Sequence, residues 1–201
     1  MFSWQFVVDF WFGQLDDDGL PEALCRKRWF RASKTFDWEV RRRFLTMVLV
    51  ASEDGLDSWR SEPGGALAEI ILLDQFTRNI HRGTALAFSN DRQARRLCLD
   101  GLDQGRDVSL PPIMRAFFYM PLQHSERLGD QERVIGLYEQ LVAQTEGDLR
   151  SLLQGFLDSA KSHADIIRQF GRFPHRNRLL GRTSTDDERR YLENGGARFG
   201  Q

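Results

Sequence analysis

The chain has 201 residues, enough for one domain that buries roughly 70% of its unfolded surface. Its 28 basic and 29 acidic residues nearly cancel, so no overall electric field would draw the protein onto nucleic acid or an anionic membrane. No apolar run approaches the roughly 20 residues of a membrane span, and Cys25 and Cys98 stand far apart in the sequence, which together predict a cytoplasmic protein.

Helical patterns follow one another along the chain. We expect helices at residues 3–12, 21–31, 36–52, 64–80, 89–103, 111–121, 126–145, 148–170 and 185–194, and we find no strand pattern. Residues 185–188 have the sequence of a capping box, which would open the last helix. The short connections predict a single all-α domain over residues 1–201, an irregular array of about nine antiparallel helices with a frayed tail at residues 195–201.

The fourth expected helix carries the most informative motif, LLDQFTRNIHRG at residues 72–83. The helix before it is apolar on nearly every side, which is typical of an element surrounded by protein. Asp74 and Arg78 are therefore expected to be buried, and buried charges need partners. They could form a structural ion pair, with Asn79 capping the helix end. Alternatively, Arg78 and Arg82 could clamp an anion, because guanidinium groups match carboxylate or phosphate with two parallel hydrogen bonds.

A second polar segment, QHSE, follows the aromatic run FFYMPL and ends at Glu126. Pro121 is expected to kink or end its helix, which would turn this segment into a gap. His124 would then be either a core residue bonded to the backbone or a general base oriented by Glu126 or Asp74. Ser125 and Glu126 could also simply start the next helix, as its cap and as an acid in its first turn.

The third segment is rich in arginine. His163 shares a helical face with apolar residues, and a lone histidine there is more often a satisfied core residue than a ligand. From Arg168 to Arg182, both included, there are five arginines and His175, with no acid. Because the stretch is short and the chain is neutral overall, it favours a small anion or an internal carboxylate partner over nucleic acid.

Several familiar chemistries lack their motifs. The four histidines show no close metal-ligand spacing, and neither a nucleophile elbow nor a phosphate-binding loop is present. The sequence therefore predicts no metal and no cofactor.

Five stretches resemble the bacterial domain-of-unknown-function family 924: VVDFWFG, FDWEVRRRF, GALAEIILLDQFTRNIHRGTALAFSND, FFYMPLQHSE and HADIIRQFGRFPHRNRLLGRTSTDDERRYL. They occur in order over almost the whole chain. The resemblance implies a tetratricopeptide-like all-α fold, a right-handed stack of helix pairs, and no assigned activity. Family members usually carry Pro at Thr77, a bulky residue at His81 and often Phe or Met at Gln123, so His81 is not expected to be functional. The positions that match the family's polar motif are Asp74, Gln75, Arg78, Asn79, Arg82, His124, Ser125, Glu126, His163, Arg172, His175, Arg176 and Asn177.

Three functions are compatible with these segments. The first is binding of a small anionic molecule or an acidic peptide by residues Asp74, Arg78, Asn79, Arg82, His163, Arg172, His175, Arg176 and Asn177. The second is a metal-independent hydrolase or transferase, with His124 as general base and Glu126 beside it. The third is an interaction scaffold in which the polar network only fastens helix ends. A single site requires that Asp74, Arg78, His124, His163 and His175 lie close together in space.

Overall fold

The computed structural model describes residues 3–199. In that range there is no strand, and one isolated β-bridge joins Leu15 to Pro21. The helices are α1 (Trp4–Phe12), α2 (Ala23–Trp29), α3 (Lys34–Ser52), α4 (Pro63–Ile70), α5 (Thr77–Ile80), α6 (Asp91–Asp103), α7 (Pro112–Gln123), α8 (Leu128–Ala143), α9 (Gly147–Phe170) and α10 (Asp186–Glu193). Each expected helix has a counterpart, so the all-α prediction is confirmed. None of the described helices is long and apolar enough to cross a membrane.

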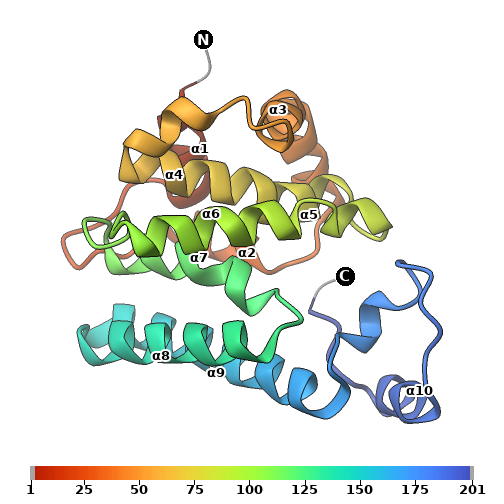
Figure 1. Cartoon of the computed structure of the whole chain (residues 1–201). Coiled ribbons are helices and arrows are strands. Elements are labelled where there is room, and N and C mark those ends of the chain that lie inside the picture. The colour runs from red at the N-terminus through yellow and green to blue at the C-terminus, as the bar shows by residue number, and fades with distance from the viewer. Residues whose placement is uncertain (1–2, 200–201) are drawn as a thin grey trace.

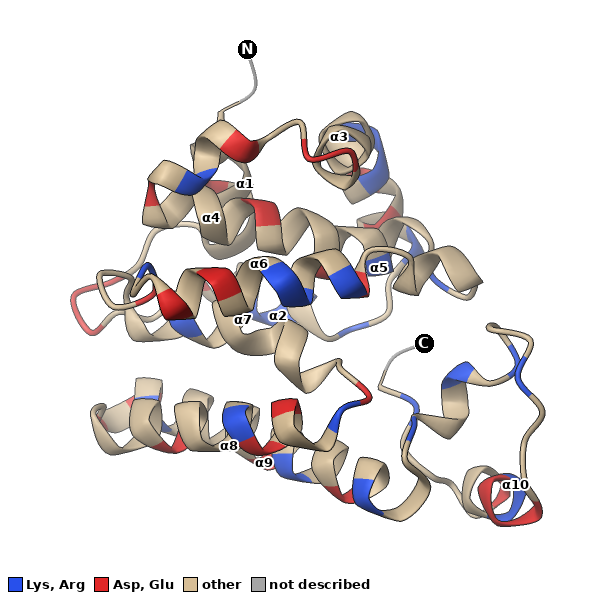
Figure 2. Ribbon diagram, viewed as in Figure 1, with Lys and Arg blue, Asp and Glu red and all other residues tan. Residues whose placement is uncertain are grey.

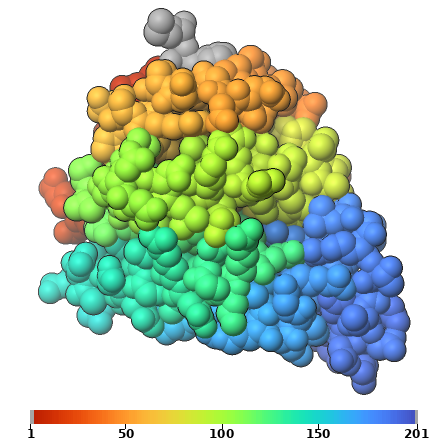
Figure 3. Space-filling model, in the orientation of Figure 1, coloured from red at the N-terminus to blue at the C-terminus, as the bar shows by residue number. Residues whose placement is uncertain are grey.

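From α3 to α9, the helices are stacked in tiers that follow chain order. Figure 1 shows α3 and α4 in the upper tier, α6 and α7 in the middle, and α8 with α9 below. The space-filling view has the same order, with the C-terminal segment at one end (Figure 3). Helices α8 and α9 pack along each other, and α7 packs against both. The tetratricopeptide-like handedness of this stack stays a prediction.

One continuous helix runs from α4 to α5 through a π-helical segment, Ile71–Phe76. Every residue of that segment is buried, because α3 and α6 to α7 pack around it. A π-helical turn inside an α-helix is uncommon and is found frequently at functional sites. This one contains Asp74 and Gln75, so it sets where the buried acid points.

Pro121 does not end its helix, although an end there is one of the two outcomes that the sequence predicts, and a kink stays a prediction. Helix α7 continues to Gln123, and His124 closes it with a backbone hydrogen bond of 3.1 Å to the Met120 carbonyl oxygen. Proline removes one backbone donor, but α6, α8 and α9 pack around α7. Packing therefore outweighs the lost hydrogen bond.

The start of α8 also differs from the prediction. The helix begins at Leu128, so Ser125 and Glu126 lie in the connection before it. The Ser125 hydroxyl donates to Asp130 Oδ2 at 2.6 Å and accepts from the Arg127 backbone N–H at 3.3 Å. Ser125 is thus not the helix cap, a position that Arg127 occupies. The capping box at Thr185, in contrast, is confirmed.

The described part of the expected frayed tail packs against the protein. The Gly196 N–H donates to the Tyr191 carbonyl oxygen at 2.9 Å, and the Ala197 N–H donates to the Tyr191 hydroxyl at 3.0 Å. The ring of Phe199 stacks on His163, with 3.6 Å between the ring centres. Residues 200 and 201, which the same prediction covers, lie outside the described residues.

Candidate functional site

Asp74 lies at the centre of the polar network and is 1% exposed. Its Oδ1 is 2.7 Å from Nδ1 of His124, which closes the end of α7. Gln75 Nε2 donates to Asp74 Oδ2 at 2.5 Å, and Arg78 Nη2 donates to Oδ1 at 3.3 Å. The buried carboxylate is therefore fully engaged, as a buried charge requires.

Asp91, at the start of α6, joins two arginines from distant parts of the chain. Arg78 Nη2 donates to its Oδ1 at 2.7 Å, and Arg176 Nη1 donates to its Oδ2 at 3.1 Å. Arg176 also donates to the His124 carbonyl oxygen at 3.0 Å. The guanidinium of Arg176 lies 4.7 Å from the ring centre of Phe88 and 4.5 Å from that of Phe173. Arg176 thus has protein partners at Nη1 and Nη2, and its role as a ligand-binding residue stays a prediction.

The charges in the network set the protonation state of His124. Burial lowers the pKa of His124, Arg78 lowers it further, and Asp74 opposes both. Burial would raise the pKa of Asp74, but His124 and Arg78 bring it well below its ordinary value. Asp74 is therefore ionised at neutral pH, and the lowered pKa of His124 favours its neutral form, whose Nδ1–H still donates to Asp74. With Nδ1–H directed at Asp74, His124 keeps Nε2 as an acceptor.

His163 and His175 are also held neutral. The ring of His163 lies 6.1 Å from that of His124, and its Nδ1 donates to the Ser159 carbonyl oxygen at 2.7 Å. Burial lowers the pKa of His163 to about 3. Burial and Arg176 lower the pKa of His175 to about 3, and its ring lies 5.6 Å from Phe199, which stacks on His163. The five residues required for a single site are thus linked by direct contacts or through one intervening ring.

Lowering the pH from 7 to 5 should cost about 2 kcal/mol of stability through His163 alone. Its pKa is about 3 in the folded protein against an ordinary value of 6.5. Between these values the unfolded chain binds the extra proton, so stability falls as the pH drops through 6.5. The variant His163→Asn, which keeps an N–H donor, should lose this part of the pH dependence. Urea unfolding at pH 7 and pH 5 measures the loss of free energy of unfolding in the wild type and in the variant. Equal losses in the two proteins would show that His163 takes up its proton without unfolding.

Asn79 and Arg82 share a carboxylate that sequence reasoning missed. Asn79 Nδ2 donates to Asp37 Oδ1 at 2.8 Å, so Asn79 does not cap its helix. Arg82 donates to Asp37 through Nε at 2.7 Å and through Nη2 at 3.0 Å. Asp37 belongs to α3 and Asp91 to α6. The one available signal was that both acids lie inside segments matching the family, FDWEVRRRF and TALAFSND.

A cleft of about 240 Å³ opens beside this network, and we call it the central cleft. Its polar lining residues are Gln75, Arg78, Asn79, Arg82, Gln123, His124, Ser159 and His163, and its apolar ones are Trp29, Phe30, Met120 and Phe199. Two arginines line it, and no Asp or Glu is among its lining residues. Small-ligand sites commonly combine apolar walls with a few convergent polar groups in this way.

His124 also lines an open groove of about 830 Å³ on its other side. Arg176 and four further arginines face this groove together with Asp54, Asp91 and Glu126. Carboxylates already neutralise part of that charge, for example through the pair of Arg96 and Asp54 at 3.0 Å. Charges of both signs are likewise interspersed along the ribbon in Figure 2. The groove therefore carries charges of both signs in its lining, whereas the lining of the central cleft holds arginines and no carboxylate, although Asp37, Asp74 and Asp91 pair with those arginines from outside that lining.

Comparison with known proteins fits this architecture. Residues 7–196 match the family model described as bacterial protein of unknown function (DUF924). The chain belongs to this family. A solved structure of a protein of unknown function from Agrobacterium tumefaciens has a TM-score of 0.81 and 34% sequence identity, over 96% of this chain and 97% of that one. None of the curated proteins matches the chain.

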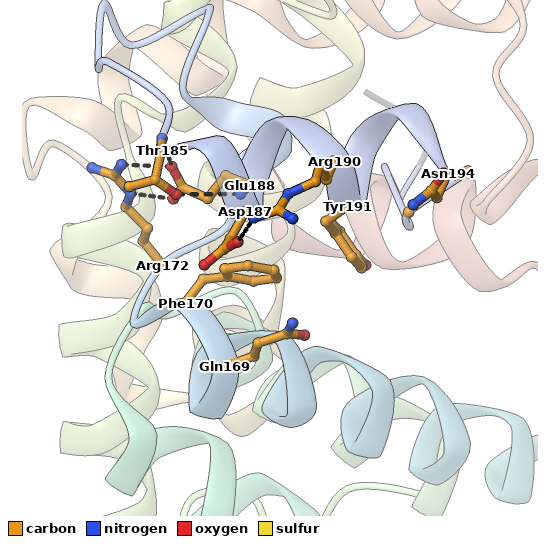
Figure 4. A pocket seen from close by; sticks show the side chains of 11 residues that line it. Gln169, Phe170, Arg172, Thr185, Asp187, Glu188, Arg190, Tyr191 and Asn194 are labelled. Carbon is orange, nitrogen blue, oxygen red and sulfur yellow. Dashed lines mark hydrogen bonds and ion pairs between the residues drawn. The ribbon is translucent and has the colours of Figure 1, made fainter.

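Two motif residues of this DUF924 protein lie away from the central cleft. Arg172 donates to Glu188 through Nε at 2.6 Å and through Nη2 at 2.8 Å, and Asn177 donates to the same carboxylate at 3.1 Å. The hydrogen bonds from Arg172 lower the pKa of Glu188 to about 2. Arg172 and Glu188 line a separate hollow of about 810 Å³ near α10. Figure 4 shows their side chains beside each other. These contacts fasten α10 to the preceding segment.

Glu126 likewise lies outside the central cleft. It accepts from Arg182 Nη1 at 2.7 Å and from the Phe173 backbone N–H at 2.8 Å. It therefore holds the arginine-rich segment and does not orient His124, which is the role of Asp74. Among residues 3–199, no group of three or more His, Cys, Asp or Glu side chains could hold a metal ion.

Proposed function

We propose that this DUF924 protein binds a small organic acid in the central cleft. The observation that carries the proposal is that Arg78 and Arg82 line the cleft while no carboxylate does. Both neighbouring histidines have lowered pKa values, so the positive groups of the lining at neutral pH are the two arginines, each of which also binds a carboxylate outside the lining. A carboxylate is the planar partner that a guanidinium group matches best.

Unpartnered polar atoms support the same proposal. Arg78 Nε and Gln123 Oε1 are buried and have no hydrogen-bond partner. A buried polar atom without a partner costs roughly 1 to 3 kcal/mol, so the fold gains nothing from these two atoms alone. A carboxylate at this wall would accept from Arg78 Nε after a small rotation of that side chain, and an ordered water beside it would donate to Gln123 Oε1, which is itself an acceptor. The two buried free cysteines fit a reducing compartment, and we place the activity in the cytoplasm.

Butanoate should bind the protein, and butanamide, which has the same size without the charge, should not. Replacing Arg82 with glutamine should weaken butanoate binding by about tenfold, the effect of losing about 1.4 kcal/mol from a charged hydrogen bond. The matched control is Arg43→Gln, since Arg43 pairs with Glu39 on the surface of α3 and does not line the cleft.

Protein-observed NMR titrations measure these affinities. Equal binding of acid and amide, or the same affinity in Arg82→Gln as in Arg43→Gln, would refute recognition of an acid by this cleft.

A second candidate is hydrolysis with His124 as general base. The contact of 2.7 Å between Asp74 Oδ1 and His124 Nδ1 favours it, because a carboxylate on Nδ1 leaves Nε2 to accept a proton. The Ser125 hydroxyl is bonded to Asp130, so water would have to be the nucleophile. Release of 4-nitrophenol from 4-nitrophenyl butanoate, lost by at least about a hundredfold in His124→Gln, would select this candidate. No release above the buffer rate would leave binding alone.

A further inference from the structure

A second hollow, of about 250 Å³, adjoins the central cleft. Phe30, Met120, Gln123 and Ser159 line both, so the two share a wall. Its remaining lining residues are Leu152, Gly155 and Phe156 of α9. We call it the apolar hollow, because no charged residue lines it.

The lining residues change from charged to apolar between the central cleft and the apolar hollow. Arg78 and Arg82 lie at one end, and the side chains of Leu152 and Phe156 lie at the other. Gln123 lies at the junction, where its Nε2 donates to Ser159 Oγ at 3.2 Å and its Oε1 is buried without a partner. The path from the arginines to α9 therefore changes from charged through polar to apolar.

Phe30 stands beside both spaces and is 61% exposed. Its ring centre lies 5.6 Å from that of Phe156. A large aromatic side chain left this exposed beside an apolar hollow offers surface that a ligand could cover. Water gains little in such a space, because few polar partners face it.

We infer that the ligand is an amphipathic acid, with its carboxylate in the central cleft and a short aliphatic or aromatic tail in the apolar hollow. The inference rests on the proposed function, since the same cleft holds the acid group. Each methylene group buried in the hollow should tighten binding about fourfold. The hollow thus selects among acids by their tails, and the arginines recognise the shared head group.

Gly155 allows the hollow to be filled without disturbing the fold. A Cβ atom at this position would meet no atom within 4 Å, and leucine is a better helix former than glycine. Gly155→Leu should therefore fold and occupy the hollow. Gly136→Leu in α8 is the matched control, because a Cβ there also meets nothing within 4 Å and Gly136 lines neither space.

The experiment is an NMR titration of acetate, butanoate and hexanoate into the wild type and both variants. In the wild type and in Gly136→Leu, the dissociation constant should fall by about fourfold per added methylene group. Gly155→Leu should bind acetate as the wild type does but lose the gain from longer tails.

If acetate binds and tail length has no effect, or if Gly155→Leu keeps the full gain, the tail inference is wrong and the proposed function stands. If none of the acids binds to the wild type, the proposed function fails and the tail inference fails with it.

Discussion

Replacing Asp74 with alanine should lower the free energy of unfolding by about 3 to 5 kcal/mol, the range for removing one partner from a buried ion pair. The substitution deprives His124 and Gln75 of their acceptor and leaves Arg78 with Asp91 alone. Because Arg78 keeps that second carboxylate, we expect the loss near the lower end of the range. Urea unfolding at pH 7 measures it.

The control for this variant is a surface pair. Asp165 binds Arg168 at 2.9 Å with 74% of its side chain exposed, and Asp165→Ala should cost about 1 kcal/mol or less. A similarly small loss in Asp74→Ala would show that the Asp74 network contributes little to the fold.

Replacing Arg176 with glutamine should lower the free energy of unfolding by about 2 to 4 kcal/mol, from a buried charged hydrogen bond and two cation–π contacts. Asp91 and the His124 carbonyl oxygen each lose a donor, and the rings of Phe88 and Phe173 lose the guanidinium between them. Arg176→Lys should recover only part of the loss, because an ammonium group keeps the charge but cannot stack flat on a ring.

Phosphate should stabilise wild type and Arg176→Gln equally, since Arg176 already has protein partners. The control is Arg190→Gln, whose partner Asp187 is exposed, and it should be nearly neutral. Thermal melting with and without phosphate measures both effects. A loss below about 0.5 kcal/mol, with phosphate stabilising only the wild type, would show that Arg176 is a ligand clamp.

The helices and the burial of the network follow from local sequence. The first backbone N–H groups of a helix have no partner inside the helix. Pro63, at the first position of α4, has no N–H group to leave unpaired, and the capping box at Thr185 provides an acceptor for one, so both mark helix starts. The apolar surroundings of Asp74 and Arg78 predict their burial, and the structure places both below 10% exposure.

The partners of the arginines do not follow from local sequence. Arg78 and Arg176 meet at Asp91, and Arg82 binds Asp37. Those contacts depend on how α3, α6 and the segment that carries Arg176 are placed around the helix from α4 to α5, which no spacing along the chain encodes. The π-helical turn cannot be predicted from the sequence either, because its residues have the pattern of an ordinary buried helix. As a result, the arginine-rich third segment looks unpaired in sequence, although acids from other elements pair with much of it.

The choice of ligand also depends on packing. Gln123 and Ser159 come from α7 and α9, and only their proximity joins the central cleft to the apolar hollow. The sequence predicts a positive site in this region, whereas the tail space becomes visible only once α9 is placed against α7.

The most direct test is a crystal structure with 4-bromobenzoate, in which the anomalous signal of bromine locates the tail. We predict the carboxylate beside Arg78 in the central cleft and a bromine peak in the apolar hollow near Leu152 and Phe156. A bromine peak in the groove on the other side of His124, or no peak in either space at saturating ligand, would contradict the account.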